Sequence, residues 1–157
     1  MRPARAAPLR GFTLIELLVV LVIAAVAVAV VGVSGQAYME RARYQQTVLD
    51  LSTELGRARA LSREKGQAVV LSWAPQTRQI AVDGQAVLEI PPSLVVTWQA
   101  VGHVRARVPV LGDPVFVFDP DGRARGGPLQ IVRGVQGVRF QVNWLLGTVQ
   151  QTAAIVS

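Results

Sequence analysis

The pattern of apolar and polar residues divides this chain into three segments. In the first, residues 12–33, the apolar run is interrupted only by Thr13, Glu16 and Gly32. As an α-helix, these 22 residues at 1.5 Å each would extend for roughly 33 Å, and a hydrocarbon core is about 30 Å thick. The pattern therefore predicts a transmembrane helix over residues 12–33.

The second segment, residues 34–65, is amphipathic. Its apolar and small residues recur at steps of three and four, which places them along one stripe of a helix. They are Tyr44, Val48, Leu51, Leu55, Ala58 and Ser62, with Leu61 beside the stripe. Gly66 follows as a C-terminal stop signal. Together the two segments predict a nearly continuous helix from about residue 13 to 65, whose second half packs on a soluble domain.

The third segment, residues 66–157, changes to a period of two, which is typical of strands. Asp83-Gly84 is a strong hairpin signal, and residues 119–122 (Asp-Pro-Asp-Gly) have the residue order of a type I turn. The strands expected around these turns are 68–73, 79–82, 86–90, 94–98, 115–118 and 129–133. The fold class is therefore α+β, a long N-terminal helix packed on a small antiparallel β-sandwich.

The clearest alternation marks the last strand that the pattern predicts. Four large apolar residues alternate there with polar ones, so one face is expected to join the core and the other to meet water. The inward set is Val138, Phe140, Val142 and Trp144, and the outward set is Arg139, Gln141 and Asn143.

Charge and cysteine content narrow the possible functions. The formal charge is +6, and Arg2, Arg5 and Arg10 precede the apolar run without any acid among them. The chain has no cysteine, which excludes disulfide bonds, thiol catalysis and cysteine-based metal sites. In an oxidising compartment, the soluble domain must therefore be held together by its core alone.

Three interpretations of the N-terminus are open from the pattern. A secretory signal peptide would end near Ala25-Val26-Ala27, but its apolar region is usually about 7–15 residues, shorter than this run. An uncleaved signal anchor explains the length and the leading arginines, yet gives no reason for Glu16. The third interpretation rests on the residues at the start of the run, and it accounts for all of these features.

Residues 10–17, RGFTLIEL, closely resemble the type IV prepilin motif. By this resemblance, a prepilin peptidase removes the leader, residues 1–11, by cutting between Gly11 and Phe12, and N-methylates the new Phe12 amine. The resemblance also implies that Glu16 registers the subunit in a filament by contacting the Phe12 ammonium of a neighbour. Burying a lone carboxylate in apolar surroundings costs free energy, and the cost is smaller when a cation contacts the carboxylate. The alternative is a Glu16 side chain that extends to the membrane interface.

Later motifs resemble the GspH/FimT family, and with the N-terminus the likeness covers essentially the whole chain. They are residues 51–60 (LSTELGRARA), Gly66-Gln67 before a valine-rich strand, residues 116–122 (FVFDPDG), and Gly147-Thr148-Val149. The best match within that family is a minor pseudopilin of the general (type II) secretion pathway, near the filament tip. A minor pilin of a type IV pilus, including one that binds DNA for uptake, is the alternative.

This resemblance implies a single-pass protein of the bacterial inner membrane, with a cytoplasmic N-terminus and a periplasmic globular domain. The expected partners are the prepilin peptidase, other pseudopilins and the assembly platform of the inner membrane. We expect no enzymatic activity and no cofactor, because the sequence contains neither a phosphate-binding loop nor a nucleophile motif.

Other candidate sites have simpler explanations. Asp113, Asp119 and Asp121 lack the ligand spacing of a calcium loop, so a turn-forming role is favoured for the last two. His103 is the only histidine and has no histidine partner for a metal. Several arginines could form a phosphate-binding patch, although ordinary solvated arginines are the favoured interpretation and nucleic acid an unlikely partner. They are Arg105, Arg107, Arg123, Arg125, Arg133 and Arg139.

Overall fold

The computed structural model describes residues 12–102 and 109–154, except for the side chains of residues 30–37. The chain divides after Met39 into two compact units, and helix α1 (Leu14–Lys65) contributes residues to both. The bounds of α1 confirm the continuous helix that the sequence predicts from about residue 13 to 65.

The first unit is helical in its described part and carries exposed apolar side chains. The large ones run from Phe12 and Leu14 to Val28 and are mostly more than half exposed. No helix in the described ranges is both long enough and apolar enough to cross a membrane. The transmembrane helix over residues 12–33 stays a prediction.

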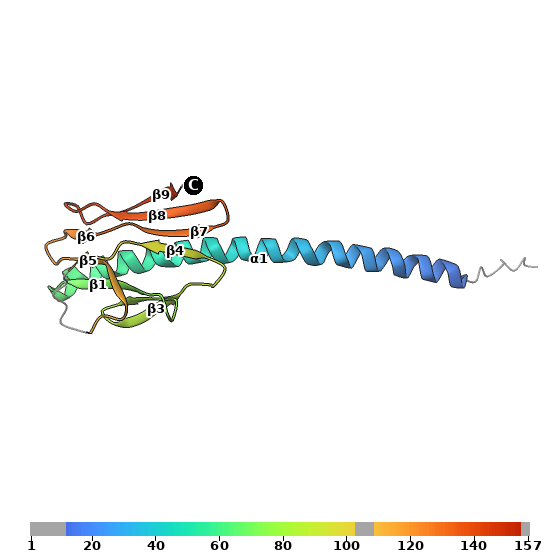
Figure 1. The fold of residues 1–157 in the computed structure, drawn as a ribbon, viewed down its shortest axis with the longest axis horizontal. Coiled ribbons are helices and arrows are strands. Elements are labelled where there is room, and N and C mark those ends of the chain that lie inside the picture. Colours follow the sequence, from blue (N-terminus) through green and yellow to red (C-terminus); the bar gives the residue numbers. More distant parts are fainter. Residues whose placement is uncertain (1–11, 103–108, 155–157) are drawn as a thin grey trace, which may run out of the picture. The chain divides into compact units, whose positions relative to one another are not determined.

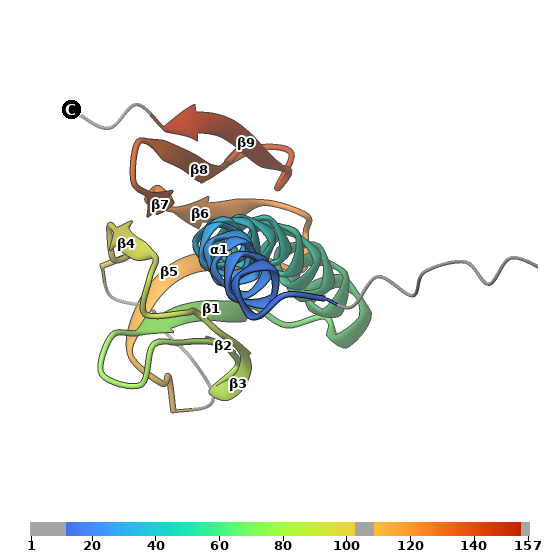
Figure 2. The same ribbon diagram turned by 90° about the vertical axis from the view of Figure 1, so that its right-hand side faces the viewer.

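The second unit contains two antiparallel sheets (Figure 1). The five-stranded sheet has the order β3-β2-β1-β5-β6, and its strands are β1 (Val69–Ala74), β2 (Gln79–Val82), β3 (Gln85–Glu89), β5 (Asp113–Phe118) and β6 (Ala124–Gly126). The four-stranded sheet has the order β4-β7-β8-β9, and its strands are β4 (Val95–Trp98), β7 (Leu129–Arg133), β8 (Gln136–Val142) and β9 (Val149–Ala154). In the second unit, β8 and β9 lie on one side of α1, and β2 and β3 on the other (Figure 2).

The core of this unit joins the amphipathic stripe of α1 to both sheets. Leu51, Leu55 and Ala58 are fully buried, and Tyr44 and Ser62 are buried beside them, as the helical periodicity predicts. From the sheets, aromatic side chains dominate, because each buries a large apolar area. The largest fully buried ones are Trp73, Phe116, Phe118 and Phe140. The α+β class, a helix packed on antiparallel sheets, is therefore confirmed and is consistent with a pilin-like fold.

The hairpin signal at Asp83-Gly84 is also confirmed. Both residues have positive φ angles, 49° and 78°, as a two-residue hairpin turn with matched twist requires. The Asp83 carboxylate accepts a 3.1 Å hydrogen bond from the backbone amide of Val70, which fixes the turn against β1. The turn joins β2 to β3, with Val82 opposite Gln85.

The prediction for Trp144 is wrong. Strand β8 ends at Val142, and the Trp144 side chain is 68% exposed, whereas Phe140 of the same inward set is fully buried. The cause is Asn143, whose side-chain oxygen accepts hydrogen bonds from the backbone amides of Leu145 and Leu146, both 3.0 Å. These bonds fold residues 143–147 into a turn, and the chain returns as β9, a strand that the period-two pattern does not predict.

Candidate processing and assembly site

Helix α1 begins with a threonine cap. The backbone amide of Glu16 donates to the Thr13 hydroxyl at 3.3 Å and to the Thr13 carbonyl at 3.1 Å. The Leu17 amide donates to the same carbonyl at 3.2 Å. Since the first amides of a helix have no partner within it, these bonds define Thr13 as the N-cap residue. Phe12 therefore lies outside the helix, directly before its cap.

The residues around this cap form a known start signal for helices. Thr13 at the N-cap and Glu16 three residues later match the capping-box spacing. Phe12 before the cap and Leu17 in the first turn occupy the two positions of a hydrophobic staple. The motif that resembles a prepilin cleavage site therefore also encodes the start of α1, whose N-cap is the second residue after the bond expected to be cut.

Glu16 occupies a favourable electrostatic position. It is the acidic residue in the first turn of α1, where the partial positive charge of the helix N-terminus stabilises a carboxylate by about 0.3–1 kcal/mol. A free amine at Phe12 would add a full positive charge at the same end. Glu16 is exposed, so its side chain is accessible to a cation from its own chain or from a neighbouring one.

The predicted site residues are only partly described. Phe12 is 75% exposed, while Gly11 and the leader lie outside the described residues. The roles of Gly11, Phe12 and Glu16 stay predictions. Sequence reasoning missed Thr13, although the Thr-x-x-Glu spacing before an apolar run was a signal that could have identified it.

The three aspartates considered for calcium have separate partners. Asp113 accepts a 3.1 Å hydrogen bond from the indole of Trp98, and Asp121 accepts one of 3.0 Å from the Arg123 amide. The turn after β5 is closed by the Gly122 amide bonding to the Asp119 carbonyl at 3.1 Å. Within the described ranges, no group of three or more histidine, cysteine or acidic residues is arranged to hold a metal ion.

The candidate arginine patch is partly balanced by acids. Arg123 lies 3.5 Å from Asp121, Arg125 lies 3.7 Å from Asp119, and Arg133 lies 3.8 Å from Glu40. Each neighbouring carboxylate reduces the positive potential available to a phosphate. His103, Arg105 and Arg107 lie outside the described residues.

Comparison with known proteins gives a family match for the N-terminal segment. Residues 10–32 match the family of the prokaryotic N-terminal methylation motif. Comparison with curated proteins and with solved structures gave no match. The motif supports a type IV pilin-like protein with a prepilin-type N-terminus, and it fits a membrane-anchored protein. It implies processing by a prepilin peptidase and assembly with other pilin-like subunits.

Proposed function

We propose that this chain is a minor pseudopilin, a structural subunit of the type II secretion pseudopilus, which helps to export folded proteins across the outer membrane. One observation supports the pilin-like part of the proposal: the methylation motif, residues 10–32, includes the start of a 52-residue helix, whose N-cap Thr13 is the second residue after the expected cleavage point. A filament subunit needs such a helix, since it both anchors the precursor and packs in the assembled core.

Processing would change the charge at the start of α1. Hydrolysis of the Gly11–Phe12 bond releases the leader as a carboxylate and leaves an ammonium on Phe12. That ammonium lies at the positive end of the helix, where it is unfavourable unless an acid is near. Glu16, one turn further, supplies the acid. In a packed filament the same carboxylate would accept the Phe12 ammonium of a neighbouring subunit and so fix the axial register.

The anchoring proposal rests on the apolar run and its flanks. An unpaired carboxylate near the middle of a membrane costs about 3 kcal/mol, and less near an end, which favours a position of Glu16 close to the interface. Arg2, Arg5 and Arg10 would keep the N-terminus cytoplasmic by the positive-inside rule. The second unit would then lie in the periplasm of a single-pass inner-membrane protein.

The choice of secretion system rests on the family resemblance. Residues 51–60 lie on α1, and residues 116–122 form the end of β5 and its turn, so two of the shared motifs coincide with defined elements. The lack of cysteine weakly favours a pseudopilin, because many pilins close a C-terminal loop with a disulfide. The second candidate is a minor pilin of a type IV pilus, which would share the same N-terminus. Neither role is enzymatic.

Deletion of the gene tests the choice between these two roles. We expect secreted enzymes to accumulate in the periplasm of the deletion strain while surface pili and DNA uptake remain normal. Expression of the intact chain should restore secretion. Loss of pili or of DNA uptake with normal secretion would contradict the pseudopilin role and favour the pilus subunit.

A further inference from the structure

Three consecutive apolar side chains project from the turn between β8 and β9. Trp144, Leu145 and Leu146 are 68%, 54% and 58% exposed, and we call these three residues the apolar knob. Exposed apolar clusters of this kind mark interaction sites, and tryptophan is among the residues that most often dominate a binding interface. The knob is therefore unusual for a surface that meets only water.

The backbone of the knob is held in one conformation. Asn143 binds the amides of Leu145 and Leu146, and the Gly147 amide donates to the Asn143 carbonyl at 2.8 Å. From α1, the Arg59 guanidinium donates a 2.7 Å hydrogen bond to the carbonyl of Leu146. A turn that is already ordered loses little conformational entropy when its side chains are buried against a partner.

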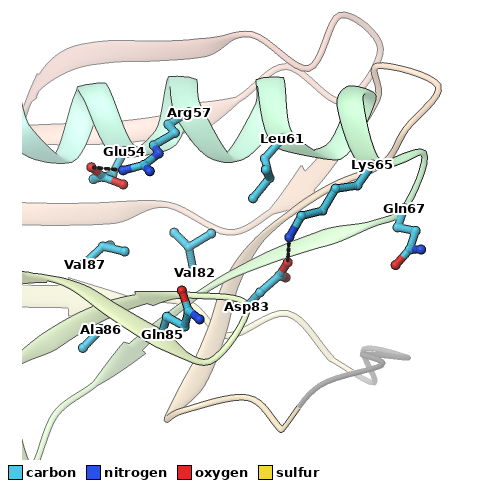
Figure 3. A pocket seen from close by; sticks show the side chains of 10 residues that line it. All are labelled: Glu54, Arg57, Leu61, Lys65, Gln67, Val82, Asp83, Gln85, Ala86 and Val87. Carbon is cyan, nitrogen blue, oxygen red and sulfur yellow. Dashed lines mark ion pairs between the residues drawn. The ribbon is translucent and has the colours of Figure 1, made fainter.

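A groove on the same unit has the chemistry to receive such a knob. It has a volume of about 480 Å³ and lies between α1 and the β2–β3 hairpin (Figure 3). Leu61, Val82, Ala86 and Val87 give it an apolar lining. Two ion pairs border it, Glu54 with Arg57 at 3.8 Å and Lys65 with Asp83 at 4.0 Å.

The knob and the groove lie at opposite edges of the five-stranded sheet. The groove is lined by β3 at one edge, whereas the Ala124 amide of β6, at the other edge, donates to the Trp144 carbonyl at 3.3 Å. One copy therefore cannot fill its own groove with its own knob. A contact between two copies would be heterologous, and its repetition would give a ring where the rotation closes and a helical filament where it does not.

The charges around the two features are complementary. Beside the knob, Asp119 and Asp121 face four arginines, so the net charge is +2; the arginines are Arg59, Arg63, Arg123 and Arg125. The four charged residues that line the groove balance one another, because Arg57 and Lys65 are matched by Glu54 and Asp83. Outside the lining, Asp50 precedes Glu54 by one helical turn and Glu64 directly precedes Lys65, so α1 adds two acids next to the groove and the net charge of the region becomes −2. Complementary charges at a rim favour and orient association.

We propose that the apolar knob of one copy docks into the α1/β2–β3 groove of a second copy of this chain. The contact rests on the proposed assembly role, and it adds a specific junction between second units to the packing of N-terminal helices. It is compatible with a subunit present in few copies, because one junction needs only two.

Cysteine cross-linking of the full-length chain in bacterial membranes tests this contact. The natural chain has no cysteine, so introduced thiols are the only ones. One tagged copy carries Leu145→Cys in the knob, and a second copy with another tag carries Ala86→Cys in the groove. A short bismaleimide then joins thiols that lie close together. The matched control replaces Leu145→Cys by Val135→Cys, which is 88% exposed in the turn between β7 and β8.

We expect at least about fivefold more cross-linked dimer from the Leu145/Ala86 pair than from the Val135/Ala86 pair, because docking raises the effective concentration of the two thiols. Adding Trp144→Ala to the Leu145→Cys copy should reduce the yield to that of the control. Equal yields from both pairs, or transfer of the Leu145 cross-link to a different protein or to lipid, would overturn the proposal. The N-terminal mass of the same samples reports leader removal separately, so a failed contact is distinguishable from a failed pilin-like assignment.

Discussion

The hydroxyl of Thr13 accepts a 3.3 Å hydrogen bond from the backbone amide of Glu16, the residue expected to register subunits. Glu16 therefore belongs to the first turn of a capped helix and cannot shift along the axis without breaking that cap. A carboxylate whose height on the helix is fixed can specify the axial position of a neighbouring amine. In this way the local start of α1 and the proposed assembly role are connected.

Thr13→Ala should loosen the first turn of α1. Loss of an N-cap side chain costs about 1 kcal/mol, so amide hydrogen exchange at Glu16 and Leu17 should accelerate roughly fivefold. NMR of the processed chain in detergent micelles measures these amides directly. Thr13→Ser keeps the hydroxyl and should exchange as the natural protein does. Equal exchange in the alanine and serine variants would show that the cap does not stabilise this turn.

Glu16→Gln tests whether the charge of the Glu16 side chain, and not its size, is needed for assembly. The variant keeps the size of the side chain and removes its charge, so leader cleavage should proceed normally. Recovery in sheared filaments should fall at least about tenfold, which corresponds to a lost pairing of about 1.4 kcal/mol. Quantitative immunoblots of filament and membrane fractions measure the recovery of the subunit in filaments. Normal incorporation together with normal secretion would refute the registration role.

Leu51→Ala should destabilise the second unit strongly. Leu51 is fully buried between α1 and the sheets, and removing a buried leucine side chain costs about 2–5 kcal/mol. Leu49→Ala is the matched control on the same helix, since Leu49 is 63% exposed and should change stability by less than about 0.5 kcal/mol. Urea unfolding measures the stability of the two variants. It can be followed by near-UV circular dichroism, to which the buried Trp73 contributes. Similar losses in both variants would contradict the assignment of the core stripe.

Gly147→Ala should lower the free energy of unfolding more than Gly134→Ala does, although both glycines have positive φ angles, 61° and 56°. A Cβ at Gly147 would collide with the carbonyl oxygen of Gly122, whereas one at Gly134 would meet nothing within 4 Å. Each variant bears a backbone strain of about 1–2 kcal/mol, and Gly147→Ala should lose roughly 1–3 kcal/mol more through overpacking. Equal unfolding free energies would show that the turn beneath the apolar knob is not closely packed.

Tyr44 should make the second unit sensitive to alkali. Burial raises the pKa of the Tyr44 hydroxyl above its ordinary value, which is near 10. The unfolded chain therefore loses this proton at a lower pH than the folded chain. The resulting stability is fully present below about pH 10 and is lost as the pH rises through the folded pKa.

The matched variant for this titration is Tyr44→Phe, which has no hydroxyl. Between about pH 9 and about pH 11, the natural chain should lose more of its unfolding free energy than the variant does. Urea unfolding at a series of pH values measures the difference. Parallel curves for the two proteins would mean that Tyr44 ionises equally in the folded and unfolded chains.

The helix and most strands could be predicted because their signals are local. The stripe from Tyr44 to Ser62 repeats with the helical period, and Asp83-Gly84 specifies its own hairpin. Strand β9 carries no such signal, since Val149–Ala154 contains Gln150, Gln151 and Thr152 and is mostly exposed. It exists because β8 offers a free edge with which to pair, and such pairing is a property of the folded unit.

Trp144 shows the limit of periodicity. It continues the alternation of Val138, Phe140 and Val142, yet a local hydrogen-bonding side chain, Asn143, ends the strand one residue before it. At the N-terminus, the motif and its spacing predict roles for Phe12 and Glu16. The same spacing, Thr-x-x-Glu before an apolar run, also indicates the Thr13 cap, which the hydrogen bonds of the first turn show directly.

The N-terminus of the membrane-extracted chain tests the central claim most directly. Intact mass and N-terminal sequencing should be applied to the chain expressed with and without a prepilin peptidase. We predict a chain that begins at N-methylated Phe12 when the peptidase is present and at Met1 when it is absent. A chain that begins at Met1 in both strains, or one cut after Ala27, would contradict a pilin-like subunit.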